Sequence, residues 1–152
     1  SLLWKVLVVS ALTLDKKLLL SWTDIDDLVQ ILCKKISEEL PNIDSVHGIA
    51  RGGLIPAVLI SHQLGLKYTN EIYPNTLVVD DICDSGETLK NAPGVYTATL
   101  HYKKTAIVKP TLYAELVGLE DNWIVYPWER HDSAPVRDNT WKDLIQNKNQ
   151  KG

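Results

Sequence analysis

The sequence contains no methionine and no phenylalanine, and only two of its 152 residues are cysteine, Cys33 and Cys83. Two cysteines do not supply the disulfide framework of a small secreted domain, so a reducing compartment, the cytoplasm, is expected. Methionine is missing even at position 1, as in a processed, truncated or incompletely represented chain.

An excess of positive charge is also lacking, since the net charge is −3. This argues against a basic surface that binds nucleic acid. The apolar residues 6–14 follow Lys5, but Asp15 and two lysines come next without a small-residue cleavage site, and the run is too short to span a bilayer. We therefore expect neither export nor a membrane partner. An anionic ligand would need local dipoles, a metal ion or a few placed cations.

Length and composition predict a single domain over residues 1–152, since 45% of the residues are hydrophobic and 23% are charged. Residues 4–9 and 17–22 are short apolar segments that favour a strand or hairpin at the edge of the core. Apolar residues at helical spacing predict an amphipathic helix from Ser21 to near Pro41. Residues 130–152 form a polar tail.

A strand, a glycine-containing turn and a helix occur in this order twice. Residues 43–50 read as a buried strand, Arg51-Gly52-Gly53 as the turn, and residues 54–64 as a helix that ends at Gly65. Residues 77–79 read as the end of a second buried strand, and a helix opens near Ser85. Two such units predict an α/β fold with a mostly parallel sheet and sites at the carboxyl ends of its strands. Further strands are expected at 95–102 and 123–126.

Residues 77–89 combine acids with a loop suited to an anion. Asp80 and Asp81 follow the strand, Asp84 lies in the turn, and small or hydroxyl residues open the helix, where backbone amides lack helical partners. Such amides bind phosphate, whereas carboxylates repel it unless a cation or a sugar hydroxyl lies between them. A ligand that carries phosphate, a polyol and Mg²⁺ would satisfy both groups.

This stretch closely resembles the phosphoribosyl-pyrophosphate (PRPP) signature of type I phosphoribosyltransferases: four apolar residues, two acids and a Ser/Thr-Gly loop. Residues 50–56 look like the pyrophosphate loop of the purine enzymes, and residues 123–129 are similar to a C-terminal stretch of xanthine-guanine and related purine phosphoribosyltransferases. The resemblance covers roughly residues 22–129. It implies the type I phosphoribosyltransferase fold, a mostly parallel twisted sheet flanked by helices, with a reduced hood formed by the chain termini.

The resemblance also implies an activity. A purine phosphoribosyltransferase of the hypoxanthine, guanine or xanthine type transfers the 5-phosphoribosyl group from PRPP to a 6-oxopurine and releases pyrophosphate, with Mg²⁺, in purine salvage. Asp84 would be the catalytic carboxylate near N7 of the purine, where it can take or share the proton, although an N-cap of the following helix also fits it. The PRPP-binding residues would be Asp80 and Asp81 for the ribose hydroxyls and Mg²⁺, with Asp81 meeting the metal through water; Ser85, Gly86, Glu87 and Thr88 for the 5′-phosphate; and Arg51 and Gly52 for pyrophosphate.

For the base, the resemblance implies Lys103 near the exocyclic oxygen, with Lys104 as an adjacent competitor. Trp123 would stack on the purine with Ile124 beside it, and Trp128 would serve packing. A solvated lysine pair and a tryptophan in the core or in an interface are the structural alternatives. Relatives commonly form dimers or tetramers, so a homo-oligomer is expected.

The chain departs from the family pattern at two places. Glu87 replaces a frequent small or basic residue, but its backbone N–H could still serve. Only eleven residues separate Gly65 from Leu77, where family members usually have a longer loop that closes over PRPP. This short loop suggests the alternative, a catalytically weak PRPP-binding regulatory protein on the same fold. A dinucleotide-binding oxidoreductase is disfavoured, because no G-x-G-x-x-G motif follows a strand.

Overall fold

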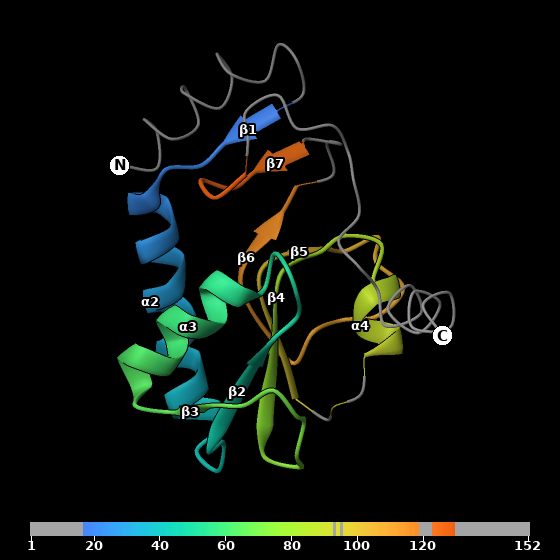
Figure 1. Ribbon diagram of the computed structural model, residues 1–152. Helices are drawn as coiled ribbons and strands as arrows, with labels where there is room; N and C mark the ends of the chain where they lie inside the picture. Colours follow the sequence, from blue (N-terminus) through green and yellow to red (C-terminus); the bar gives the residue numbers. More distant parts are fainter. Residues whose placement is uncertain (1–16, 93, 95, 119–122, 130–152) are drawn as a thin grey trace, which may run out of the picture.

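The structure is a computed structural model that describes residues 17–92, 94, 96–118 and 123–129 (Figure 1). The predictions for residues 4–9 and 130–152 lie outside the described residues. The described elements are, in chain order, β1 (Lys17–Leu19), α2 (Trp22–Glu39), β2 (Ser45–Gly48), α3 (Leu54–Leu64), β3 (Lys67–Tyr68), β4 (Thr76–Cys83), α4 (Glu87–Asn91), β5 (Tyr96–Lys103), β6 (Leu112–Val117) and β7 (Trp123–Val125).

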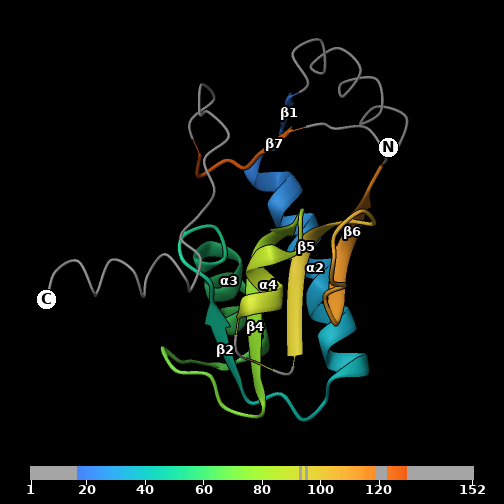
Figure 2. The ribbon, with the colours of Figure 1, turned by 90° about the vertical axis from the view of Figure 1, so that its right-hand side faces the viewer.

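The main sheet has five strands in the order β3-β2-β4-β5-β6, and every neighbouring pair is parallel. Helices α2 and α3 cover one face of this sheet and the short α4 lies on the other, as the two ribbon views show (Figure 1 and Figure 2). Val79 packs into the core on the α2 and α3 side, and Val78 into a second cluster with Leu89 of α4. This burial on both faces is typical of parallel strands and confirms the predicted α/β class.

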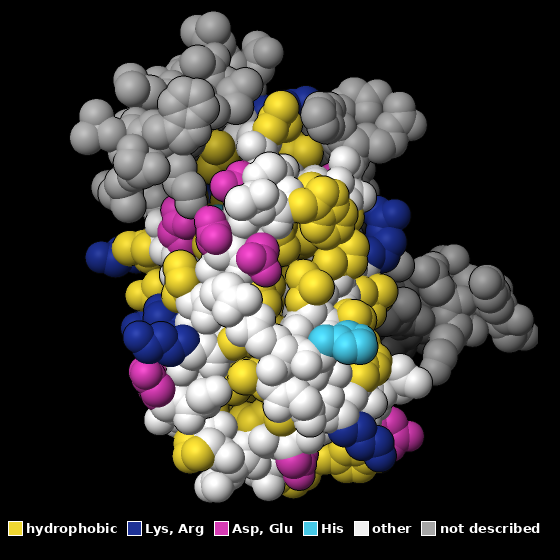
Figure 3. Space-filling view, turned by 90° about the vertical axis from the view of Figure 1, so that its left-hand side faces the viewer, with side chains coloured by type: hydrophobic (Ala, Val, Ile, Leu, Met, Phe, Trp, Pro, Cys, Tyr) yellow, Lys and Arg dark blue, Asp and Glu magenta, His cyan; other side chains and the backbone are white. Residues whose placement is uncertain are grey.

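Helix α2 begins at the predicted place because of its cap. The Ser21 hydroxyl accepts a hydrogen bond from Asp24 N at 3.1 Å, and the Asp24 carboxylate accepts one from Ser21 N at 2.9 Å. This capping box satisfies two amides that have no partner within the helix. Its apolar stripe is buried against the sheet through Ile25, Leu28, Val29, Leu32, Cys33 and Ile36. The outer surface on this side of the molecule mixes hydrophobic, acidic and basic side chains (Figure 3).

A two-stranded parallel sheet, which we call the hood, consists of β1 and β7 and pairs Lys17 with Trp123 and Leu19 with Val125. The hood lies beyond the carboxyl edge of the main sheet (Figure 1). Residues 17–22 thus contain a strand, as expected, and its partner comes from the far end of the described chain. The predicted strand at 123–126 is confirmed with one residue fewer.

Several predicted boundaries were wrong. Strand β4 does not end at Val79 but continues to Cys83, because Asp80, Ile82 and Cys83 pair with Thr99, His101 and Tyr102 of β5. The helix expected to open near Ser85 begins at Glu87. Strands β3 and β6 were not predicted: β3 has two residues, and β6 is an edge strand whose residues are mostly half-buried or exposed.

The short connection of residues 69–75 lies at the amino-terminal edge of the sheet. Strand β3 pairs with the first residues of β2, and β4 begins at Thr76 opposite Ser45. Local hydrogen bonds hold the connection in place: Tyr73 N donates to Thr76 Oγ1 at 3.0 Å, and the Tyr73 hydroxyl donates to Glu71 Oε2 at 2.9 Å. It therefore lies at the opposite end of β4 from Asp84 (Figure 1).

None of the described helices is long and apolar enough to cross a membrane.

Candidate functional site

The two acids predicted to face the ribose lie within β4 and are buried, with 5% of Asp80 and 7% of Asp81 exposed. Each side chain accepts a hydrogen bond from the next backbone amide: Asp80 Oδ1 from Asp81 N at 2.9 Å, and Asp81 Oδ1 from Ile82 N at 2.7 Å. The pair is thus held in place by its own strand near the carboxyl edge.

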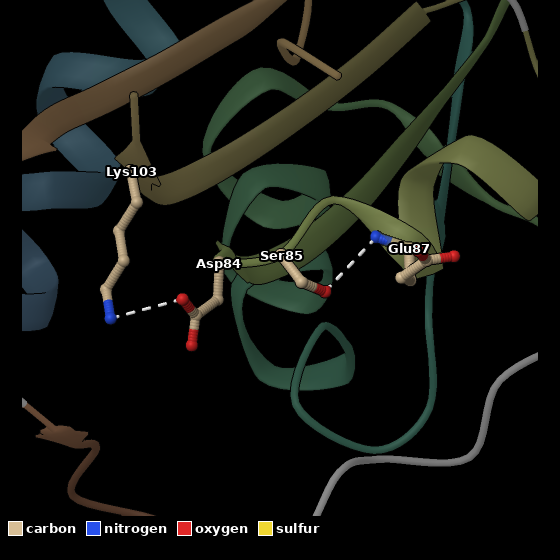
Figure 4. Close-up of polar contacts among 4 residues, drawn as sticks. All are labelled: Asp84, Ser85, Glu87 and Lys103. Atoms are coloured by element: carbon tan, nitrogen blue, oxygen red, sulfur yellow. Dashed lines mark hydrogen bonds and ion pairs between the residues drawn. The ribbon is translucent and has the colours of Figure 1, made fainter. Parts of the chain in front are cut away.

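The loop of residues 84–88, which was predicted to bind a phosphate, packs against residues 106–108. Ile107 N donates to Ser85 O at 2.9 Å. Gly86 has φ of 86°, and a Cβ there would lie 2.9 Å from Val108 N and 3.0 Å from Ile107 N. Only glycine combines this conformation with such a close approach at low cost. Glu87 N donates to the Ser85 hydroxyl at 3.3 Å, a long bond (Figure 4).

Asp84 forms an ion pair with Lys103, with 3.1 Å between Asp84 Oδ1 and Lys103 Nζ (Figure 4). The Lys103 side chain is 15% exposed and that of Asp84 is 63% exposed. The alternative role of Asp84 as an N-cap is wrong, because Gly86 occupies the cap position without a side-chain hydrogen bond. Lys103, rather than the exposed Lys104, is the lysine that meets Asp84.

The Arg51 turn joins the same edge of the sheet. The Ala50–Arg51 peptide bond is cis, Arg51 is exposed, and Gly52 is buried. Ile49 N donates to Val79 O at 2.9 Å, and a Cβ on Gly53 would lie 2.2 Å from that same carbonyl oxygen. The turn therefore packs directly on β4 one residue before the acid pair.

Of the residues predicted to bind the base, Trp123 and Ile124 lie on the hood, whereas Lys103 is the last residue of β5 in the main sheet. Trp123 is half-buried at the start of β7, whereas the Ile124 side chain is buried in the main core. Only the main chain of Ile124 is thus left for a role in binding. The Trp128 ring stacks on Tyr126 with centroids 4.8 Å apart and lies 6.0 Å from Trp22, in keeping with a packing role.

Two buried polar residues beside the acid pair were missed from the sequence. His101 Nδ1 lies 2.8 Å from the Tyr126 hydroxyl, which also donates to the Asp81 carbonyl oxygen at 3.2 Å. Burial lowers the pKa of His101 to about 4. Burial and then the nearby carboxylates, Asp81 first, raise the pKa of Tyr126 well above its usual value. The available signal was a histidine inside the predicted strand 95–102 and a tyrosine at the end of the predicted strand 123–126.

A resident metal centre is not formed by the described residues, which contain no cluster of three or more His, Cys, Asp or Glu placed to hold an ion. The acid pair supplies two carboxylates at most. This donor set fits Mg²⁺ that arrives with substrate phosphates, because Mg²⁺ keeps several waters and needs only one or two carboxylates from the protein.

Comparison with known proteins gives a consistent picture, although no protein-family profile matches the chain. Xanthine-guanine phosphoribosyltransferase of Vibrio parahaemolyticus is 24% identical over 147 residues, which cover 76% of this chain and 91% of the relative. The crystal structure of a purine phosphoribosyltransferase from Pyrococcus horikoshii aligns with a TM-score of 0.65 and 28% identity, over 82% of this chain and 99% of that one. A Helicobacter pylori xanthine-guanine-hypoxanthine enzyme shares the fold, with a TM-score of 0.62, 18% identity, and 88% and 97% of the two chains covered.

The fold, the edge at which the site residues gather and these likenesses define the class: the chain has the type I phosphoribosyltransferase fold, and its relatives are enzymes that transfer phosphoribosyl groups. Within this class it is similar to the purine phosphoribosyltransferases, the xanthine-guanine enzymes among them, as the sequence predicted. Sequence identities of 24% and 28% do not determine which purine base this chain uses.

Proposed function

We propose that this chain is a cytoplasmic purine-salvage enzyme that transfers the 5-phosphoribosyl group of PRPP to a 6-oxopurine base, giving the nucleoside 5′-monophosphate and pyrophosphate. The observation that carries the proposal is the Asp84–Lys103 ion pair of 3.1 Å. It places an acceptor and a donor side by side where β4 and β5 end, in a chain similar to purine phosphoribosyltransferases.

The PRPP half of the site would use main-chain groups and carboxylates. The amides of the loop Ser85, Gly86, Glu87 and Thr88 would bind the 5′-phosphate, which would displace the long bond between Glu87 N and the Ser85 hydroxyl. Asp80 and Asp81 would accept hydrogen bonds from the ribose hydroxyls. Arg51 and Gly52 would bind pyrophosphate, and Asp81 would meet its Mg²⁺ through water. The Mg²⁺ would supply positive charge that stabilises the leaving group.

The ion pair would favour oxo over amino purines. A 6-oxopurine presents the O6 acceptor beside N7 with its proton on one edge, which matches the Lys103 donor and the Asp84 acceptor. An aminopurine would direct a second donor at the ammonium group of Lys103. As the base forms its bond to C1′ and pyrophosphate departs, Asp84 would take or share the N7 proton and stabilise positive charge on the ribose ring.

The hood would hold the base. Trp123 offers a flat apolar face that any purine can stack on, and the main chain of Ile124 lies next to it on β7. We also propose a homo-oligomer, dimer or tetramer, without a nucleic-acid or membrane partner.

One observation favours a second candidate, a PRPP-binding regulatory protein with weak turnover. The connection of residues 69–75, which corresponds in sequence to the closing loop of the family, lies at the wrong edge of the sheet to cover Asp84. Without such a cover, water would compete at the reacting centre.

The test measures pyrophosphate release from PRPP and Mg²⁺ with hypoxanthine, guanine, xanthine or adenine. We expect release with at least one 6-oxopurine and little with adenine. Asp84→Asn should lower kcat by roughly 10²- to 10⁴-fold, the usual range for loss of a general acid or base, with PRPP binding retained in calorimetry. Lys103→Met should raise the KM of the oxopurine.

The neighbouring Lys104→Met is the matched control and should leave all constants unchanged, because Lys104 is exposed. PRPP binding without pyrophosphate release for any base would favour the regulatory protein. Absence of both binding and release would overturn the phosphoribosyltransferase proposal itself.

A further inference from the structure

The Tyr126 hydroxyl lies where the hood meets the main sheet. Tyr126 directly follows β7 and is 2% exposed. Its hydroxyl contacts β4 through the Asp81 carbonyl oxygen, at 3.2 Å, and β5 through His101 Nδ1, at 2.8 Å. Among the described strands, β7 has a backbone ladder with β1 and not with β4 or β5. This side-chain contact therefore links two sheets that no ladder joins there.

The direction of each hydrogen bond follows from the chemistry of the three groups. A carbonyl oxygen can only accept, so the Tyr126 O–H donates to Asp81 O. The single hydroxyl proton is then used, and His101 Nδ1 must donate to the tyrosine oxygen, which assigns the neutral tautomer protonated at Nδ1. The lowered pKa of His101, about 4, and the raised pKa of Tyr126 keep both groups neutral near pH 7.

The ring that carries this hydroxyl is held firmly. It stacks on Trp128 with an interplanar angle of 3°, and Trp128 in turn contacts Trp22 at the start of α2. Tyr126 O accepts from Glu129 N at 2.9 Å, and Tyr126 N donates to Glu129 Oε1 at 3.3 Å. The hydroxyl thus has a defined position relative to both the hood and the acid pair.

We propose that Tyr126 is a positioning residue that couples the base-stacking strand to the ribose-binding strand. Tyr126 lies three residues after Trp123 and donates a hydrogen bond to the main chain of Asp81. This bond fixes the separation between the base on Trp123 and the sugar hydroxyls at Asp81. This inference rests on the proposed transferase function. Bringing the base and C1′ into line is worth a large share of the rate, and a misplacement of about 1 Å can cost about 100-fold.

The test uses Tyr126→Phe, which removes the hydroxyl and keeps the ring stack. We expect kcat/KM for the purine to fall at least tenfold, while the PRPP Kd measured without base changes less than threefold. Trp123→Leu should have a comparable effect, and the double variant should lose much less than the product of the two losses, since both act on base placement.

A purely structural role would behave differently. Ile36→Val, which trims the buried core of α2 away from the hood, is the matched control for stability and should lower Tm with kcat/KM unchanged. If Tyr126→Phe behaves like Ile36→Val, or if its effect multiplies independently with that of Trp123→Leu, the positioning role is overturned.

Failure of the proposed function would look different again, since the wild-type protein would then release no pyrophosphate with any purine. In that case, hydrogen exchange measures whether Tyr126 couples β7 to β4. Faster exchange of the β7 amides in Tyr126→Phe than in Ile36→Val would support it, and equal exchange would overturn it.

Discussion

Cys83 lies between the acids of the signature, yet its thiol is unsuited to chemistry. The side chain is buried, and Sγ donates to Val108 O at 3.4 Å. Burial first, and then the charges of Asp80 and Asp84, raise the pKa of Cys83 to about 11. Burial raises the pKa of Cys33, on α2, to about 11 as well. Because the thiolate is the nucleophilic form, neither cysteine is placed to form a covalent intermediate.

Alkylation tests this residue-scale conclusion. In native protein at pH 8, iodoacetamide should modify neither Cys33 nor Cys83 over a period in which both react fully in denaturant, as followed by intact mass. Burial and a minute thiolate fraction both slow the reaction. Rapid native modification of Cys83 alone would show that the end of β4 opens in solution.

At the scale of elements, the Arg51 turn depends on a close contact between backbones. Gly53 N donates to Ile49 O at 2.8 Å, and the Cβ position of Gly53 meets the Val79 carbonyl. Gly65, at the other end of α3, has φ of 64° with nothing within 4 Å of its Cβ position. One glycine is needed for space and the other for conformation.

The two alanine variants separate these roles. Gly53→Ala should cost about 2–3 kcal/mol, as overpacking does, and weaken PRPP binding at least tenfold because Arg51 and Gly52 move with the turn. Gly65→Ala should cost about 1 kcal/mol through backbone strain, with PRPP binding unchanged. Urea unfolding and calorimetry measure both effects. Equal PRPP affinities would show that the turn does not contact this ligand.

Helices whose ends are marked by a capping residue or a glycine were predictable from the sequence. Helix α2 has its Ser21 cap, and α3 has glycines on both sides, so their bounds followed from the sequence. The extension of β4 through Asp80 and Asp81 did not, because carboxylates disfavour a strand and only pairing with β5 overrides this preference. Strand β6 likewise depends on its neighbour rather than on its own pattern.

At the scale of the whole molecule, the parallel topology explains why the acid pair, the Asp84 loop, Lys103 and the Arg51 turn gather at one edge, as expected from the order of strands and turns. The contact between His101 and Tyr126 was not predictable in this way. It depends on how the hood sits on the sheet, and neither residue carries a local signal of its partner.

This buried contact predicts a pH dependence of global stability. The pKa of His101 is about 4 in the folded chain, below its ordinary value of 6.5. Between these values the unfolded chain binds a proton that the folded chain does not, so the free energy of unfolding should fall as pH drops from about 6.5 to about 4. This pKa shift corresponds to a loss of unfolding free energy on the order of 3 kcal/mol. Above pH 6.5 His101 is neutral in both the folded and the unfolded chain, so its contribution to the stability no longer changes with pH.

Urea unfolding at pH 7, 6, 5 and 4 would measure this loss. His101→Gln should flatten the profile between pH 6.5 and 5, where most carboxylates stay ionised. His62→Gln, at an exposed position on α3, is the matched control and should keep the wild-type slope. A slope unaltered by the His101 change would mean that this imidazole titrates normally in the native protein.

The pairing of β1 with β7 has a consequence for synthesis. Strand β1 leaves the ribosome roughly a hundred residues before the segment it pairs with, whereas β2 to β6 are all translated in between. Non-local contacts of this kind form late, because a long loop must first be closed. On a nascent chain, the sheet edge proposed to bind the sugar phosphate would therefore be assembled before the hood proposed to bind the base, and the last described residues to be translated would decide when both are in place.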